Sequence, residues 1–156
     1  MITIDIPGRE QPLSIRSIVL DYNGTVALDG AVLPGLGERI AALRELAEVY
    51  VLTADTYGTV AAQCAPWGVH VMPFPRPDAA ACKAESVRGL GSGVCCLGNG
   101  WNDIPMFDLA ELSIAVLEGE GLCAALVSHA DVLVRCPQDG LDLLLHPNRL
   151  RATLRG

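Results

Sequence analysis

The sequence predicts an α/β fold, a doubly wound parallel sheet with helices on both faces and a β-hairpin before it. From residue 17 onward, short aliphatic runs alternate with amphipathic segments of helix length, which is typical of βα units. The 156 residues fit one domain, and an apolar content of 51% is ample for its core. We therefore expect a single domain over 1–156, with a hairpin extension over 1–16 and an α/β core over 17–156.

The first 16 residues show the two-residue period of a half-buried hairpin. Apolar residues alternate with polar ones on both sides of a Pro7-Gly8 turn, at Ile2, Ile4, Ile6, Leu13 and Ile15. This segment lies outside the main repeat. Its free edge could pair with another copy of the chain, so a homo-oligomer is expected.

The α/β core is predicted to contain six buried strands, over 17–21, 49–53, 69–72, 93–97, 112–116 and 131–134. The first helix begins near Pro34 and carries apolar residues at helical spacing, Leu36, Ile40, Leu43 and Leu46. Further helices are expected over 56–66, 78–89, 102–110, 121–129 and 138–152, the last with a break at Pro147. Asp55 is interpreted as a helix cap, and the proline-rich segment 73–77 excludes regular structure.

Charge and composition exclude several classes of partner. The formal net charge of −7, from 18 acidic and 11 basic residues, argues against nucleic acid or an anionic membrane. No apolar stretch approaches the ~20 residues of a membrane span, and the first residues lack a signal-peptide pattern, so a cytoplasmic protein is expected. The six cysteines form no CxxC pair and are assigned to core packing.

Polar side chains follow the predicted strands at the edge of the sheet where such folds bind ligands. Asp21 comes directly after the aliphatic run 18–20, and Thr53 ends the second strand. Lys83, the one lysine of the chain, lies in the opening turns of the third helix, and Asp103 follows a glycine loop after the fourth strand. Each alone fits a turn, a cap or a solvated charge. Four such groups at one edge favour a catalytic site.

These residues resemble the haloacid dehalogenase superfamily, whose members form an aspartyl-phosphate, over nearly the whole chain after the hairpin. The likeness extends to the phosphorylation domain of P-type ATPases and to soluble P-type-ATPase-like proteins. The four motifs occur in the family's order, as Asp21-Tyr22-Asn23-Gly24-Thr25, Leu52-Thr53-Ala54-Asp55, Lys83 and Gly98-Asn99-Gly100-Trp101-Asn102-Asp103. The chain has no membrane helices and no room for a nucleotide-binding insert, which excludes a pump.

The resemblance implies a role for each matched residue. The catalytic residues would be Asp21, as the nucleophile, with Asn23 and Lys83. Phosphate oxygens would be held by Gly24, Thr25, Thr53, Ala54 and Asn102. A magnesium ion would be bound by Asp21, Asn23, Asn99 and Asp103. The implied partner is a small phosphorylated substrate or a phosphoprotein.

Two departures from the family pattern bear on activity. Asn23 stands where family phosphatases have an aspartate that protonates the leaving group, and an amide cannot do so. General acid–base help is typically worth ~10² to 10⁴ in rate, so good leaving groups such as acyl or aryl phosphates are favoured. Asn99 stands where the family usually has a magnesium-binding aspartate, which removes a charge. A catalytically weak phosphate-binding module is therefore the alternative to an enzyme.

The segment between the first strand and the first helix, 26–34, is too short for a cap domain. An open site is therefore expected, from which water would be excluded by a large substrate, by another subunit or by a small flap such as 28–33.

Overall fold

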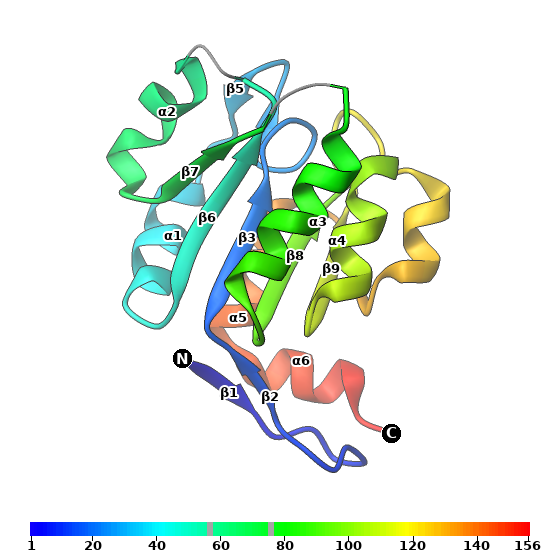
Figure 1. Cartoon of the computed structure of the whole chain (residues 1–156). Helices are drawn as coiled ribbons and strands as arrows, with labels where there is room; N and C mark the ends of the chain where they lie inside the picture. The colour runs from blue at the N-terminus through cyan, green and yellow to red at the C-terminus, as the bar shows by residue number, and fades with distance from the viewer. Residues whose placement is uncertain (56–57, 75–76) are drawn as a thin grey trace.

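The computed structural model describes residues 1–55, 58–74 and 77–156 and has a six-stranded parallel sheet at its centre (Figure 1). The strands are β3 (Ser17–Asp21), β6 (Glu48–Thr53), β7 (His70–Pro73), β8 (Val94–Gly98), β9 (Leu112–Val116) and β10 (Val132–Val134). Their order is β10-β9-β8-β3-β6-β7, and every neighbouring pair is parallel. Each lies within one residue of its predicted bounds, which confirms the predicted fold class.

The central strand β3 is buried along its whole length because both of its faces are covered. Ile18 and Leu20 belong to the core on one face of the sheet, and Val19 belongs to the core on the other. This is the two-residue period of a strand in which both faces are apolar. Asp21 ends the run, so the chain places a carboxylate at the carboxyl end of a fully buried strand.

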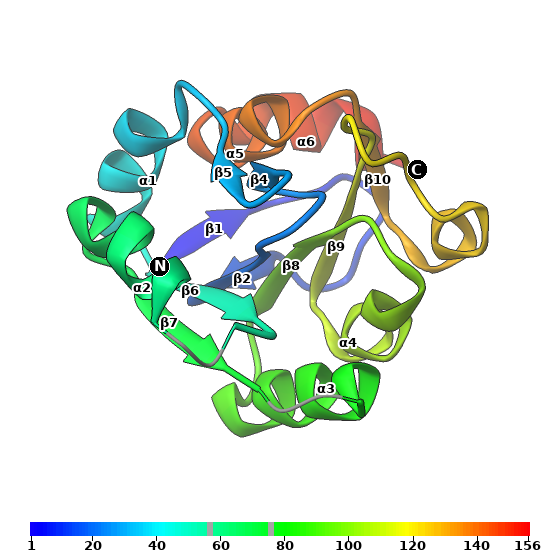
Figure 2. The same cartoon turned by 90° about the horizontal axis from the view of Figure 1, so that it is seen from above.

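Helices cover both faces of the sheet, as Figure 2 shows from above. The core on one face includes residues of α1 (Leu36–Arg44), α2 (Thr59–Cys64), α5 (Pro137–Leu145) and α6 (Pro147–Leu154). The other core includes residues of α3 (Ala79–Leu90), α4 (Ile104–Leu109) and the 3-10 helix η3 (Ala124–His129). Two further 3-10 turns are η1 (Ala65–Trp67) and η2 (Trp101–Asp103).

Most predicted helices are confirmed, and the largest difference concerns 121–129. There the helix is of the 3-10 type and starts at Ala124, because the preceding residues form a turn instead. Gly121 has a φ of +83°, and its N–H donates to the carbonyl of Glu118 at 2.7 Å. The helix expected over 56–66 begins at Thr59 in the described residues, and its first two expected positions, 56 and 57, lie outside them. The proline-rich segment 73–77 was expected to hold no regular structure, which is wrong for Pro73, the last residue of β7. Positions 75 and 76 of this segment lie outside the described residues.

Two small hairpins flank the sheet. The first pairs β1 (Ile2–Ile4) with β2 (Leu13–Ile15) in antiparallel register, as expected. It lies beside α6 at the end of the sheet opposite to the carboxyl end of β3 (Figure 1). The second hairpin, β4 (Ala27–Leu28) with β5 (Ala31–Val32), forms from the segment predicted as a flap.

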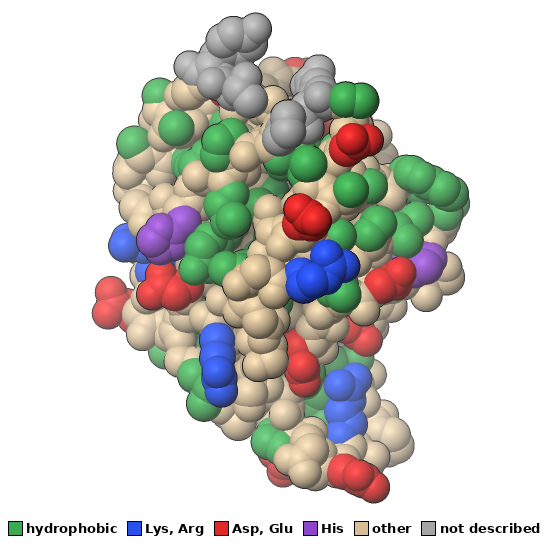
Figure 3. Space-filling view, viewed as in Figure 1, with side chains coloured by type: hydrophobic (Ala, Val, Ile, Leu, Met, Phe, Trp, Pro, Cys, Tyr) green, Lys and Arg blue, Asp and Glu red, His purple; other side chains and the backbone are tan. Residues whose placement is uncertain are grey.

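The remaining expectations concern cysteines, charge and membranes. All six cysteines are free, and Cys64, Cys95 and Cys96 are buried, which agrees with core packing. On the face shown in Figure 3, basic side chains stand apart from one another among acidic and apolar ones. None of the helices in the described ranges is both long and apolar enough to cross a lipid bilayer.

Candidate active site

A cleft of about 490 Å³ opens at the carboxyl ends of β3, β6 and β8. The chain leaves β3 for β6 on one side and reaches β8 on the other, so the cleft lies at the topological switch point of the sheet. Seven of the predicted site residues line it, namely Asp21, Asn23, Thr53, Ala54, Lys83, Asn99 and Asn102. The structure therefore brings together side chains from four separate motifs of the sequence.

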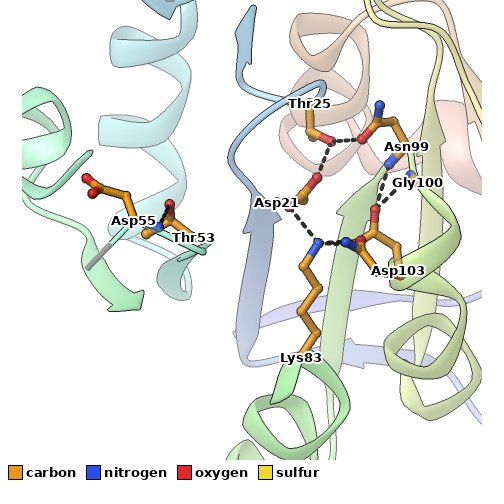
Figure 4. A network of polar contacts seen from close by, with 9 residues as sticks. Asp21, Thr25, Thr53, Asp55, Lys83, Asn99, Gly100 and Asp103 are labelled. Carbon is orange, nitrogen blue, oxygen red and sulfur yellow. Dashed lines mark hydrogen bonds and ion pairs between the residues drawn. The ribbon is translucent and has the colours of Figure 1, made fainter. Parts of the chain in front are cut away.

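The ammonium group of Lys83 is the centre of the polar network in the cleft (Figure 4). Its Nζ donates to Asp21 Oδ1 at 2.7 Å, to Asn102 Oδ1 at 2.8 Å and to Asp103 Oδ1 at 2.6 Å. An ammonium group has three N–H donors, and each has an acceptor here. Lys83 is only 2% exposed, because α3 places it beneath the cleft with its Nζ 5.7 Å from the centre of the Phe74 ring. The position of this cation is therefore set by its three acceptors.

Asp103 binds the ammonium group of Lys83 and is fully buried. Its Oδ1 accepts from Lys83, and its Oδ2 accepts from the backbone N–H groups of Asn99 and Gly100, both at 2.9 Å. Both carboxylate oxygens thus already have partners. Gly98 permits this approach, since a Cβ there would lie 2.5 Å from Asp103 Oδ2. The contacts of Asp103 are with Lys83 and the glycine loop, and its predicted part in metal binding stays a prediction.

The charges of the site shift two pKa values. Burial and the nearby Asp103 carboxylate raise the pKa of Asp21 to about 7, although Lys83 and Thr25 act in the opposite direction. Burial alone would lower the pKa of Lys83, but the two carboxylates outweigh it and the pKa is raised. Lys83 is therefore a permanent cation beside a carboxylate that is only weakly acidic in the metal-free protein.

Thr25 and Asn99 lie behind Asp21 on the side away from Lys83. Thr25 Oγ1 lies 3.4 Å from Asp21 Oδ2 and 3.5 Å from Asn99 Oδ1, both long contacts. Thr25 is fully buried and does not line the cleft. Its hydroxyl therefore contacts Asp21 and Asn99 and does not face a ligand in the cleft. Gly24, with a φ of +79°, makes the turn between Asp21 and Thr25.

The second motif lines another side of the cleft, away from the Lys83 network (Figure 4). Thr53 Oγ1 accepts a hydrogen bond from the backbone N–H of Asp55 at 3.0 Å, which leaves its hydroxyl hydrogen available for a ligand. The N-cap residue of α2 is Gly58, so Asp55 is not the cap that was expected. Its Oδ2 still accepts from the N–H of Val60 in the first turn of α2 at 2.8 Å, as a capping side chain would. Asn23 lines the cleft with an exposed side chain.

The β4–β5 hairpin beside the cleft is fastened to α2. The buried Tyr22 hydroxyl lies 2.9 Å from the carbonyl oxygen of Gly30 and 3.0 Å from Gln63 Oε1. Gln63 Nε2 donates to the same Gly30 carbonyl at 2.9 Å. The tip of the hairpin is therefore held by two side chains from different parts of the fold.

Glu120 is a cleft residue that the sequence analysis missed. It follows β9, and the carboxyl end of β9 lies at the same edge of the sheet as that of β8. The available signal was an acid in a Gly-Glu-Gly turn just after a buried strand, at Gly119-Glu120-Gly121. None of the four motifs includes this turn, so the sequence alone does not identify Glu120 as a site residue.

Comparison with curated proteins finds three informative relatives. Two are uncharacterised proteins of Methanocaldococcus jannaschii. MJ0072 is 54% identical over 39 residues, which are 25% of this chain and 89% of that protein. MJ0073 is 40% identical over 62 residues, 40% of this chain and 67% of that protein. The third, the probable copper-transporting ATPase PacS of Synechocystis, is 31% identical over 107 residues. The match covers 67% of this chain but 14% of PacS, and it supports the resemblance to P-type ATPases.

No family model matches the chain. Among solved structures, a Streptomyces avermitilis protein assigned to the HAD family of hydrolases is 24% identical with a TM-score of 0.66, over 92% of this chain and 91% of that one. The chain has the haloacid dehalogenase fold and belongs to the family of the two archaeal proteins. A second structure with this fold is 3-deoxy-D-manno-octulosonate 8-phosphate phosphatase from Moraxella catarrhalis, with magnesium, phosphate and sugar bound. It is 15% identical with a TM-score of 0.69, over 90% and 94% of the two chains.

Proteins with the haloacid dehalogenase fold include this magnesium-bound phosphatase and a cobalt-bound one from Haemophilus influenzae. In the present chain, Asp21 Oδ2 and Asn99 Oδ1 are the side-chain oxygens with only long contacts. Mg²⁺ prefers such oxygen ligands and is usually bound through one or two carboxylates together with substrate phosphates. No group of three His, Cys, Asp or Glu side chains in the described residues has metal-site spacing. The two weakly engaged oxygens of Asp21 and Asn99 fit a magnesium ion that has few protein ligands.

Proposed function

We propose that the protein is a magnesium-dependent phosphohydrolase or phosphotransferase that forms an aspartyl-phosphate on Asp21. The observation that carries the proposal is the placement of Asp21 Oδ1 2.7 Å from Lys83 Nζ at the base of an open cleft. Buried charges are costly unless they are paired, and a paired carboxylate facing a cleft at a switch point is typical of a catalytic site.

In the proposed reaction, a carboxylate oxygen of Asp21 attacks the phosphorus atom of the substrate. The new oxygen–phosphorus bond forms as the bond to the leaving oxygen breaks, and the leaving group takes its proton from water. Hydrolysis follows when water attacks the phosphorus and restores the Asp21 carboxylate. Transfer to another acceptor would use the same second step. The exposed amide of Asn23 supplies no proton to either step.

The chain's own donors hold the phosphoryl group. The Thr53 hydroxyl, the Asn102 amide and the backbone near Ala54 line the cleft around Asp21. Lys83 already uses all three of its N–H groups, so a phosphate oxygen must share or replace one of its present acceptors. Of these, Asn102 is neutral and is the acceptor that costs least to give up.

A bound magnesium ion would supply positive charge between the nucleophile and the phosphoryl oxygens. Asp21 and Asn99 present oxygens for it, and Asn23 lines the cleft beside them. Asp103, whose two oxygens are already engaged, would join the proposed set only by giving up one of these contacts. Because Asp21 has a pKa of about 7 without the ion, a cation beside it favours the ionised form that attacks.

The proposed substrates are small phosphorylated compounds with good leaving groups. A sugar phosphate is suggested by the octulosonate 8-phosphate phosphatase of the same fold, and the cleft volume suits a compound of that size. The missing acid at Asn23 favours aryl or acyl phosphates over sugar phosphates. A phosphoprotein could present the same phosphoryl group to the open cleft.

Hydrolysis of para-nitrophenyl phosphate in the presence of Mg²⁺ tests the proposal. Asp21→Asn should abolish the activity, while Glu85→Gln, an exposed change on the helix that carries Lys83, should leave it unchanged. Beryllium fluoride with Mg²⁺ should form a stable adduct on Asp21. If the wild-type protein shows neither the adduct nor activity that depends on Asp21, it is instead a binding module, the function that Asn23 and Asn99 would favour.

A further inference from the structure

The turn between β9 and η3, residues 117–123, closes one side of the cleft and presents Glu120 to it. Neither carboxylate oxygen of Glu120 has a hydrogen-bond or ion-pair partner among residues 1–55, 58–74 and 77–156. By contrast, Glu118 in the same turn accepts a hydrogen bond from the N–H of Gly119 at 3.0 Å. Glu120 is thus an uncommitted carboxylate at the edge of the proposed catalytic site.

Asn99 holds this turn in place. Its side-chain Nδ2 donates to the carbonyl oxygen of Gly121 at 3.1 Å, and its backbone carbonyl accepts from the N–H of Cys123 at 2.8 Å. The amide nitrogen therefore points at the turn, and the amide oxygen points back toward Thr25 at 3.5 Å. An aspartate at position 99 would have no N–H group for the Gly121 carbonyl. The Asn99 side chain therefore contributes a contact to the turn that an aspartate could not make.

Gly24 shows how close Glu120 comes to the nucleophile loop. A Cβ on Gly24 would lie 2.3 Å from Asn99 Nδ2 and 2.8 Å from Glu120 Oε2. Only a glycine leaves space for both groups against the backbone at this position, three residues after Asp21. The Asn99 amide and the Glu120 carboxylate thus occupy adjoining positions beside the same short loop.

The other carboxylates of the site are already engaged. Asp103 accepts short hydrogen bonds on both carboxylate oxygens, and Asp21 accepts one on Oδ1. The remaining carboxylate oxygen, Asp21 Oδ2, has only the long contact with Thr25. A divalent cation there would meet one negative charge where two carboxylates are usual, because Asn99 is neutral. Glu120 is the described acid that lines the cleft and has no partner.

We infer that Glu120 supplies the second carboxylate to the divalent cation in this cleft, while Asn99 positions the turn that carries it. The charge missing at position 99 is thus provided from another strand end. This inference rests on the proposed function, because it names a further residue of the same metal site. It also assigns Asn99 a positioning role through its contacts with Gly121 and Cys123.

Direct measurement of Mn²⁺ binding to the full chain by titration calorimetry tests the inference without relying on turnover. Glu120→Gln should raise the dissociation constant about tenfold or more, since affinity in such sites follows the number of charged ligands. Glu118→Gln, which removes the neighbouring charge outside the cleft, should bind Mn²⁺ as the wild type does. Asn99→Asp combined with Glu120→Gln should regain affinity, because it returns the charge to position 99.

The results separate this inference from the proposed function. If Glu120→Gln binds Mn²⁺ as tightly as the wild type while Asp21→Asn does not, the inference fails and the metal-dependent nucleophile stands. Failure of the wild-type protein to bind Mn²⁺ or Mg²⁺ at all would overturn both. Thermal unfolding of each variant without metal shows whether it is folded before it is titrated.

Discussion

Lys83 and Asp21 lie 62 residues apart in the chain, yet Lys83 Nζ donates to Asp21 Oδ1 at 2.7 Å in a buried ion pair. The same nitrogen lies 2.6 Å from Asp103 Oδ1. One cation therefore neutralises two carboxylates that come from different strand ends. Stability and proposed catalysis depend on the same three charges.

Lys83→Met should lower the free energy of unfolding by about 3 kcal/mol at pH 7, because it leaves two buried carboxylates without their cation. The folded-state pKa of Lys83 is raised above its ordinary value of 10.5. Its contribution is therefore fully present below that value and is lost as the pH rises past the folded pKa. Urea unfolding measures the change, with Glu85→Gln as the control on α3. A Lys83→Met variant as stable as the wild type would contradict this account.

Asp21→Asn should stabilise the metal-free protein at pH 8 by roughly 2 to 4 kcal/mol and have little effect near pH 4. The pKa of Asp21 is raised from 3.8 to about 7, so the folded state binds this proton more tightly than the unfolded state does. Ionisation of Asp21 as the pH rises from 4 to 7 therefore lowers the free energy of unfolding. Asparagine keeps an acceptor for Lys83 without the charge. Urea titrations at both pH values in EDTA measure the difference, and equal effects at both would refute the raised pKa.

Asn23→Asp should increase hydrolysis of alkyl phosphates by at least about tenfold, since it returns an acid to an exposed position that lines the cleft. Aryl phosphates, whose leaving groups need little protonation, should gain less. The ratio of the two rates is the measurement. An unchanged ratio would show that protonation of the leaving group does not limit the reaction.

Gly24→Ala should be more destabilising than Gly30→Ala, although both residues have a left-handed backbone, with φ values of +79° and +81°. Gly30 has open space where its Cβ would lie, so its cost is the backbone strain of about 1 kcal/mol. At Gly24 the new Cβ would also displace Asn99 and Glu120. Thermal unfolding and Mn²⁺ titration of the two variants should separate strain from this displacement. Equal losses of stability and of Mn²⁺ affinity in the two variants would argue against the close approach of Asn99 and Glu120 to Gly24.

The sequence was sufficient to predict the sheet and most of the helices because their signals are local. The aliphatic runs of β3 and β8 identify these segments as buried strands. The helical spacing of Leu36, Ile40 and Leu43 identifies α1 and the face that it buries. The two-residue strands β4 and β5 carry no such pattern, since their form depends on contacts of Tyr22 and Gln63 with Gly30.

The candidate site was predictable where motifs mark it and not elsewhere. The motifs indicated that Asp21, Lys83 and Asn102 would meet, and the structure places them in contact through Lys83. Glu120 could not be found in this way, because its approach to Gly24 depends on how Asn99 ties a turn from another strand. The approach of Glu120 to Gly24 joins residues 96 positions apart in the chain, and no local sequence pattern predicts it.

The fastening of the β4–β5 hairpin has a kinetic consequence. Because the Gly30 carbonyl is bound by Tyr22 and Gln63, both hydrogen bonds must break before the hairpin can swing over the cleft. Ligands would then enter and leave at rates set by diffusion and by the phosphoryl contacts, rather than by the opening of a gate. Bulk water would have access to a phosphorylated Asp21 throughout, so the lifetime of that proposed intermediate would depend on the missing acid–base group at Asn23 and not on closure of the site.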